Sequence, residues 1–209
     1  MDNHPSTPPP ITYSPPPPKP GLFGTGIPSS VAFVVAILLF FLPFTEIKCS
    51  GSTFMTKSGL GYALGQEWKV ASGFGSDLMK EEKTTKKEGD KDPATAKIFI
   101  LAAAGLGILG LLSVFARSKA AAGFGIFAGV LAGGALIAFM VEMKKWFNDS
   151  MAKQATEKIS SGDESSGLDK LGNTLNNLTF GFTPWFYVAI IAFFAAAFFS
   201  YKRMTSLRN

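Results

Sequence analysis

The sequence predicts an all-α membrane protein with four transmembrane helices and a small extracytoplasmic cap, in which a short β-hairpin is one option. Apolar residues make up 47% of the 209 residues, and the chain also carries 20 Lys and Arg and 15 Asp and Glu. These charged residues almost completely avoid four long stretches. Since a hydrocarbon core about 30 Å thick needs roughly 20 apolar residues in a helix, this segregation indicates a lipid bilayer.

The chain begins with a proline-rich segment at residues 1–26, which we expect to be a disordered cytoplasmic tail. Proline lacks a backbone donor and favours extended conformations. The first span follows at residues 27–44, with Pro28 near its start. A cleaved signal peptide is the alternative for this stretch. Because no small-x-small cleavage site follows it, we interpret it as a retained helix.

Three further apolar stretches complete the predicted spans. Asp92 and Pro93 precede the second span as a helix cap and a first-turn residue, and Thr183 is expected to cap the fourth. The remaining spans are residues 98–116, 120–141 and 184–200, and a cytoplasmic tail follows at 201–209.

Basic residues near the ends of the spans predict the orientation, because the cytoplasmic flanks of membrane proteins carry an excess of Lys and Arg. All three arginines, Arg117, Arg203 and Arg208, lie on the side of the two tails. We therefore place both termini in the cytoplasm of a multi-pass protein of the plasma (inner) membrane. The loops at residues 45–97 and 142–183 are then extracytoplasmic, and their lysines are balanced by acidic residues.

Small residues recur four apart in the third span, where they form a GxxxGxxxG ridge. In lipid no hydrophobic drive pushes helices together, so small residues let the backbones approach and gain dispersion contacts. Two interpretations stay open, internal packing of a four-helix bundle and oligomerisation or docking to a partner. Matching faces on neighbouring spans favour the first. The predicted helix-packing residues are Ala103, Gly107 and Gly110 in the second span, Ala121, Gly125, Gly129 and Gly133 in the third, and Ala192 and Ala196 in the fourth.

The first outer loop, residues 45–97, is too long for a simple connector. Two β-prone runs flank a Ser-Gly-Ser turn at residues 50–52, which makes a hairpin at the membrane surface plausible. We expect a cap over about residues 45–75 that folds against the helices, and a solvated charged arm at residues 80–92. Cys49, the one cysteine, is either a small buried residue or a thiol for an intermolecular bond.

A short pattern after the first span consists of Leu42-Pro43-Phe44, Cys49, Gly51, Ser58-Gly59, Ala63 and Gly65. It resembles a pattern in uncharacterised bacterial four-helix membrane proteins, whose first helix ends in Leu-Pro and an aromatic before a Cys-x-Gly and a Ser-Gly. The resemblance covers residues 42–65 and consists largely of turn chemistry. It implies a bacterial plasma membrane and nothing catalytic. The topology is also similar to that of claudin-like tetraspan proteins, although their Trp and paired-cysteine motif is missing here.

The sequence provides no residue set for catalysis or for a cofactor. With His4 as the one histidine, in the proline-rich segment, a Ser-His-Asp triad is effectively excluded, and with a single cysteine beside it we expect no transition-metal centre. No basic stripe with interleaved aromatic residues is present, so nucleic acid is not expected as a partner. We therefore expect no cofactor and no enzymatic activity.

The composition of the spans favours a structural role. No charged residue lies in the central part of any span, whereas ion-coupled transporters and proton pumps usually need one. We expect a structural or accessory subunit of a membrane assembly, with the lipid bilayer and either a membrane-protein partner or a second copy of the chain as its partners. A channel or transporter component is the first alternative, and a membrane enzyme is the second.

Overall fold

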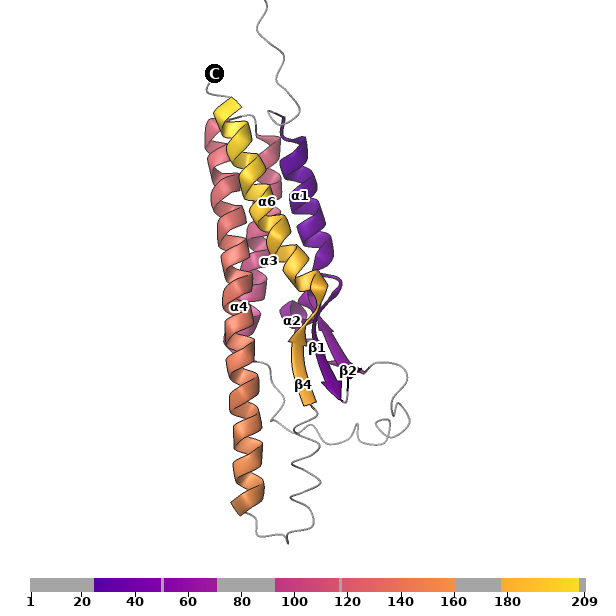
Figure 1. Ribbon diagram of the computed structural model, residues 1–209. Coiled ribbons are helices and arrows are strands. Elements are labelled where there is room, and N and C mark those ends of the chain that lie inside the picture. Colours follow the sequence, from indigo (N-terminus) through magenta and orange to yellow (C-terminus); the bar gives the residue numbers. More distant parts are fainter. Residues whose placement is uncertain (1–24, 50, 71–92, 117, 161–177, 207–209) are drawn as a thin grey trace, which may run out of the picture.

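Four long helices run side by side in the computed structural model, and a small sheet lies at one end of them (Figure 1). The structure describes residues 25–49, 51–70, 93–116, 118–160 and 178–206. The proline-rich segment and the charged arm predicted from the sequence lie outside the described residues. The helices are α1 (Ile27–Leu39), α2 (Gly59–Leu64), α3 (Ala94–Phe115), α4 (Lys119–Ser160) and α6 (Pro184–Ser206), and the strands are β1 (Pro43–Cys49), β2 (Ser52–Ser58), β3 (Lys69–Val70) and β4 (Leu178–Phe182).

Three of the described helices are long and apolar enough to cross a membrane, namely α3, α6 and the Lys119–Ser150 part of α4. Helix α1 is apolar as well but has 13 residues. It ends where Phe40, Phe41 and Leu42 donate backbone hydrogen bonds to the carbonyls three residues earlier, which is a 3₁₀-type turn. Pro43 then starts β1, because proline cannot continue the helix and disfavours helical backbone in the preceding residue.

The four long helices form a closed ring in which each contacts two neighbours. Helix α3 packs on α1 and α4, and α6 packs on the same two helices from the other side. Aromatic and aliphatic side chains fill the space between them. Phe33, Phe139, Phe186, Phe193 and Leu136 are each fully buried. Because these side chains come from α1, α4 and α6, no pair of helices encloses the core alone.

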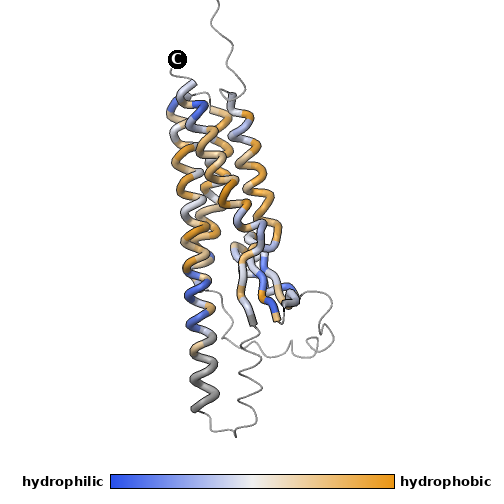
Figure 2. Tube along the Cα trace, viewed as in Figure 1, coloured by the Kyte–Doolittle hydropathy of each residue, from blue (hydrophilic) through white to orange (hydrophobic). Residues whose placement is uncertain are grey.

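Helix α4 is much longer than its neighbours. Its 42 residues correspond to about 63 Å, whereas the 22 residues of α3 correspond to about 33 Å. Figure 2 shows that α4 is hydrophobic where it runs beside the other helices and turns hydrophilic after it passes them. The helix therefore continues beyond the predicted span at residues 120–141 and projects past the helix ring.

The sheet combines two segments that are far apart in the sequence. Its order is β3-β2-β1-β4, and every neighbouring pair is antiparallel. The predicted hairpin is confirmed as β1 and β2, with Gly51 in its turn at φ 83°. A positive φ favours glycine, which carries no Cβ.

Strand β4 corrects the predicted all-α class. It immediately precedes α6 and pairs with β1 from Thr45–Phe182 to Cys49–Leu178. Its two phenylalanines alternate with Thr179 and Gly181, which is the two-residue period of a strand with one buried face. The sheet thus ties the segment before α6 to the segment after α1.

Thr183 does not cap α6 with its side chain as the sequence predicted. Its hydroxyl donates to the carbonyl oxygens of Pro43 and Phe44, and its backbone N–H also donates to Phe44. These bonds fasten the start of α6 to the start of β1. Asp92, the predicted cap of α3, lies outside the described residues, and Pro93 directly precedes that helix.

Arg203 closes the opposite end of the helix ring. The guanidinium donates to the carbonyl oxygens of Val114 at 3.0 Å and Ala116 at 3.1 Å, and the side chain is 7% exposed. The last carbonyls of a helix have no partner within the helix, and a guanidinium fork can satisfy two of them. The arginine therefore caps α3 and holds α6 against its end.

We expect Arg203→Met to lower the free energy of unfolding by about 1.5–3 kcal/mol, the typical contribution of hydrogen bonds to a charged group. Thermal unfolding of the detergent-solubilised protein measures the change. Lys202→Met is the matched control, because Lys202 is exposed and lies 5.9 Å from the ring centre of Phe198. Equal loss of stability in both variants would show that the charge, and not the cap of α3, is what matters.

Candidate functional site

Glycines of α3 make room for aromatic side chains from α1, its neighbour in the helix ring, and from α6, which lies across the ring. A Cβ built on Gly110 would lie 2.6 Å from the ring of Phe33 in α1, and one on Gly107 would lie 3.0 Å from the ring of Phe193 in α6. Contacts below 3.0 Å essentially do not occur for real Cβ atoms. The absence of a side chain at these two glycines therefore makes room for the two phenylalanines.

The GxxxGxxxG ridge of α4 faces α6. A Cβ on Gly129 would lie 2.8 Å from the carbonyl oxygen of Phe193 and 3.0 Å from the backbone nitrogen of Ala197. At Gly125 the nearest atom would be Oγ of Ser200, and at Gly133 it would be the ring of Phe194. Gly129 is the closest point, because the backbone of α6 itself lies against it.

The other predicted packing residues lie on the same inner faces. Ala103 and Ala196 are fully buried, and Ala192 is buried as well. Ala121, near the start of α4, is half-buried. The small residues are thus brought together within one chain, and α6 occupies the ridge that could otherwise have faced a second copy.

A polar contact that the sequence analysis missed lies inside the helix ring. It is near Gly125, at one end of the glycine ridge of α4. The hydroxyls of Ser29 and Ser200 are 2.7 Å apart, and Ser29 also donates to the carbonyl oxygen of Ala196. Both serines are almost fully buried. Two serines in otherwise apolar stretches were the signal for this contact, but only the pairing of α1 with α6 brings them together.

The cap contains a buried cation, which the sequence analysis also missed. Lys57 on β2 is 4% exposed, and its ammonium lies 4.7 Å from the ring centre of Tyr62 and 5.7 Å from that of Trp68. These distances are within the range of cation–π attraction. The hydroxyl of Tyr62 in turn lies 2.9 Å from that of Thr45 on β1. The cluster joins β1, β2 and α2 into one unit.

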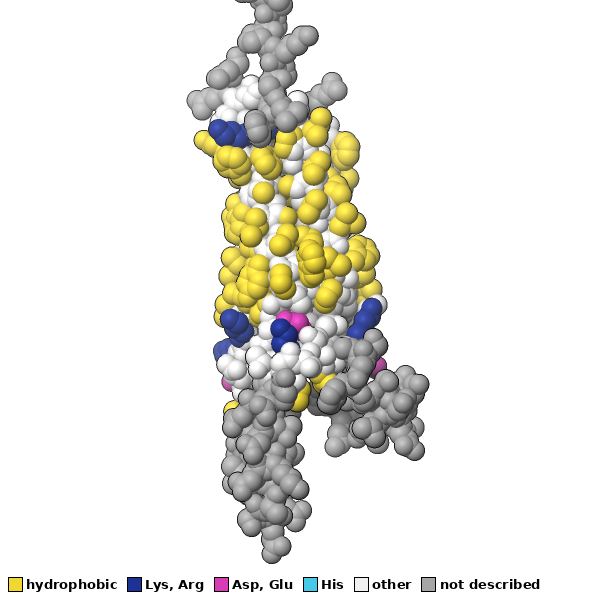
Figure 3. Space-filling model, turned by 45° about the vertical axis from the view of Figure 1, so that its right-hand side comes forward, with side chains coloured by type: hydrophobic (Ala, Val, Ile, Leu, Met, Phe, Trp, Pro, Cys, Tyr) yellow, Lys and Arg dark blue, Asp and Glu magenta, His cyan; other side chains and the backbone are white. Residues whose placement is uncertain are grey.

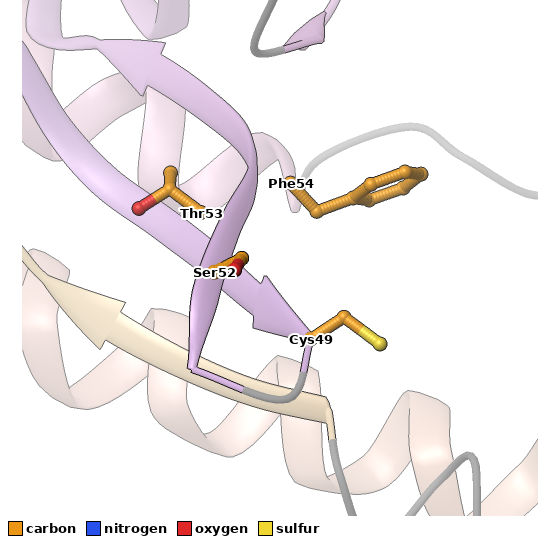
Figure 4. A pocket seen from close by; sticks show the side chains of 4 residues that line it. All are labelled: Cys49, Ser52, Thr53 and Phe54. Atoms are coloured by element: carbon orange, nitrogen blue, oxygen red, sulfur yellow. The ribbon is translucent and has the colours of Figure 1, made fainter. Parts of the chain in front are cut away.

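Cys49 is half-buried at the tip of the hairpin and forms no disulfide. Figure 4 shows its sulfur and the ring of Phe54 pointing to the same side, whereas the side chain of Thr53 on β2 points to the opposite side. The hollow that these four residues line has a volume of about 10 Å³. Such a space holds about one water molecule. Both interpretations of the cysteine stay open.

A wider groove separates the outer part of α4 from β4. Its volume is about 300 Å³, and its lining includes Lys144, Asn148 and Thr179. The rings of Phe147 and Phe180 stack across it with centres 5.0 Å apart. Among the described strands, β4 pairs with β1 alone and is therefore an edge strand of the sheet. Two of its residues, Thr179 and Phe180, line the groove.

Two of the described carboxylates take part in contacts with other side chains. Glu46 forms an ion pair with Lys48 at 2.8 Å, and Glu142 on α4 accepts a hydrogen bond from Thr95 on α3. Within the described ranges no three His, Cys, Asp or Glu side chains gather into a group that could hold a metal ion.

The chain matches no protein-family model, and a search of curated proteins finds no similar sequence. The residues and their geometry are therefore the basis of the functional argument.

We expect Gly129→Leu to destabilise the protein by about 1–3 kcal/mol, because overpacking at a backbone contact forces the helices apart. Thermal unfolding in detergent measures the effect. Gly134→Leu on the same helix is the control, since nothing lies within 4 Å of a Cβ built at Gly134. Should Gly129→Leu unfold at the same temperature as the control, the contact between α4 and α6 does not determine stability.

Proposed function

We propose that the chain is an integral membrane protein with four spans that serves as a non-catalytic structural or accessory subunit of a membrane assembly. In this proposal α1, α3, α4 and α6 cross the plasma membrane, both termini are cytoplasmic, and the sheet lies outside.

The distribution of side chains over the helix surfaces is the observation that carries the proposal. The inner faces hold glycine and alanine beside the buried phenylalanines, and many large apolar side chains also point outward, where contact with water would not favour them. Figure 3 shows these side chains as a belt between two bands of Lys and Arg. Exposed apolar side chains of the belt include Val31, Val35 and Leu38 on α1, Leu101, Ile108 and Leu112 on α3, Phe127, Val130 and Ile137 on α4, and Val188, Ile191 and Phe198 on α6.

Length supports α1 as the fourth span despite its 13 residues. The helix and the 3₁₀-type turn that follows it together extend about 25 Å, at 1.5 Å and about 2 Å per residue. This approaches the hydrocarbon thickness of about 30 Å. Helix α1 also completes the ring between α3 and α6. Without it, the ring of Phe33 could not fill the space at Gly110.

The filled centre of the ring favours a structural role over a channel. Fully buried phenylalanines from three helices meet along the axis, and the rings of Phe33 and Phe193 contact edge to face with centres 6.4 Å apart. A conducting path needs polar side chains or carbonyls along its length. The buried hydroxyls of Ser29 and Ser200 bond to each other and to a carbonyl instead.

The outer parts of the molecule support the accessory part of the proposal. Helix α4 and the sheet both extend past the belt, so they present surface beyond the predicted membrane boundary (Figure 1). Native mass spectrometry in a mild detergent tests this part. We expect a particle heavier than the 22.3-kDa chain. A monomer in every mild detergent would contradict an accessory role and leave the membrane topology untouched.

Cysteine labelling of whole cells tests the topology. In a Cys49→Ser background, we expect a membrane-impermeant maleimide to label Ser52→Cys and not Ser206→Cys, because these exposed positions lie at opposite ends of the helix ring. Both positions should react after permeabilisation, which controls for reactivity. Labelling of Ser206→Cys alone in intact cells would reverse the orientation, and labelling of neither would place the hairpin inside the membrane or under a partner.

A further inference from the structure

The short helix α2 is held firmly at the outer ends of α1 and α3. Ser58 caps its start by accepting a hydrogen bond from the backbone of Gly61, and Gly65 ends it with a left-handed φ of 64°. The N–H of Leu60 donates to the carbonyl oxygen of Phe40 at the end of α1. Helix α2 also contacts α3. Its orientation relative to the helix ring is therefore fixed by both termini and by two neighbours.

One side of α2 packs inward and its last residue points out. Gly59 lies against the rings of Phe40 and Phe44, and Tyr62 is 1% exposed. Leu64 is 61% exposed within the described part of the chain. Most of this side chain is therefore free to gain from burial in an apolar environment outside the chain.

Two further exposed apolar residues lie on the segments that α2 contacts, at the end of the apolar belt. Phe41 follows α1 and is 62% exposed, and Ile98 in the first turns of α3 is 62% exposed. Phe41 is the neighbour of Phe40, which accepts the backbone hydrogen bond from α2, and Ile98 lies on α3, which α2 contacts. A basic group marks the edge of the same surface, because Lys97 Nζ would lie 3.8 Å from a Cβ on Gly65. Beyond it, Gln66 and Glu67 are exposed polar residues.

We propose that α2 is a membrane foot that inserts Leu64 among the lipids of the outer leaflet, with Lys97 at the level of the headgroups. This inference rests on the proposed membrane function and adds the part of the cap that touches lipid. An apolar side chain beside a basic one, at the end of an apolar belt, matches the boundary between acyl chains and headgroups. The foot fixes the distance between the sheet and the bilayer, because Gly59, the first residue of α2, directly follows β2.

Continuity with the belt selects lipid as the occupant. Phe41 and Ile98 belong to segments that the proposed function places at the edge of the bilayer, so lipid that covers them extends over Leu64 without a gap. A second copy or another membrane protein is the competing occupant, and its signature differs. Lipid admits oxygen and excludes water-soluble reagents, whereas a protein partner excludes both.

Spin labelling with accessibility measurements tests the proposal on the full chain. Nitroxides are attached to single cysteines in a Cys49→Ser background, in vesicles of phosphatidylcholine and phosphatidylglycerol. The positions are Leu64→Cys, Ile191→Cys as the mid-span reference, and Ser52→Cys as the hairpin reference. All three side chains are exposed, with Ile191 at 64%, so the substitutions leave the core unchanged. The readout is the ratio of oxygen accessibility to that of a water-soluble nickel complex.

We expect the ratio at position 64 to lie several-fold above that at position 52 and below that at position 191. A water-like ratio at position 64 with a lipid-like ratio at position 191 would overturn the foot while the spans stand. Low accessibility to both reagents at position 64 would also overturn it, in favour of a protein partner. Water-like ratios at all three positions would refute the membrane function itself.

Discussion

The distance between the helices depends on glycines, and at two of them a phenylalanine ring fills the place of the missing side chain. The ring of Phe33 lies where a side chain on Gly110 would be, and the ring of Phe193 occupies the corresponding place at Gly107. In the proposed membrane setting no hydrophobic drive acts between the helices, and such contacts gain only dispersion energy, which falls steeply with separation. Each glycine therefore stabilises the packing of the four helices, because the absence of its side chain lets the phenylalanine make close contacts.

The same aromatic packing continues from the ring into the cap. Phe186 in the first turn of α6 contacts Phe44 on β1, Phe139 on α4 and Phe182 on β4, with ring centres 4.7–6.0 Å apart. Tyr62 on α2 contacts Phe139 at 5.0 Å. The sheet consequently has no separate core. Its position follows from the helices, and the bonds from Thr183 to β1 only fix its register against α6.

The sequence was sufficient to predict features that depend on local patterns. It was insufficient for features that depend on contacts between distant segments of the chain. Long apolar stretches predicted the three long apolar helices, and two β-prone runs around a glycine predicted the hairpin. Strand β4 was overlooked although Phe180 and Phe182 alternate with smaller residues. Its five residues stand directly before an apolar helix, so they resemble the end of the loop that leads into that helix. Small-residue spacing placed Gly125, Gly129 and Gly133 on one face, but spacing cannot say that α6 would cover that face.

Two charged residues show most clearly what the sequence alone could not predict. Lys57 and Arg203 stand in the sequence like any solvated lysine or arginine, yet both are buried. Arg203 has two backbone carbonyls as partners, and Lys57 lies over two aromatic rings. Neither carbonyls nor rings remove a positive charge. A buried cation with such partners costs least at the end of an apolar segment, where water or lipid phosphate is near, and far more at its centre. Both cations lie at such ends, one beside the last turn of α3 and the other in the cap. Their burial is therefore compatible with the apolar belt because of where it occurs.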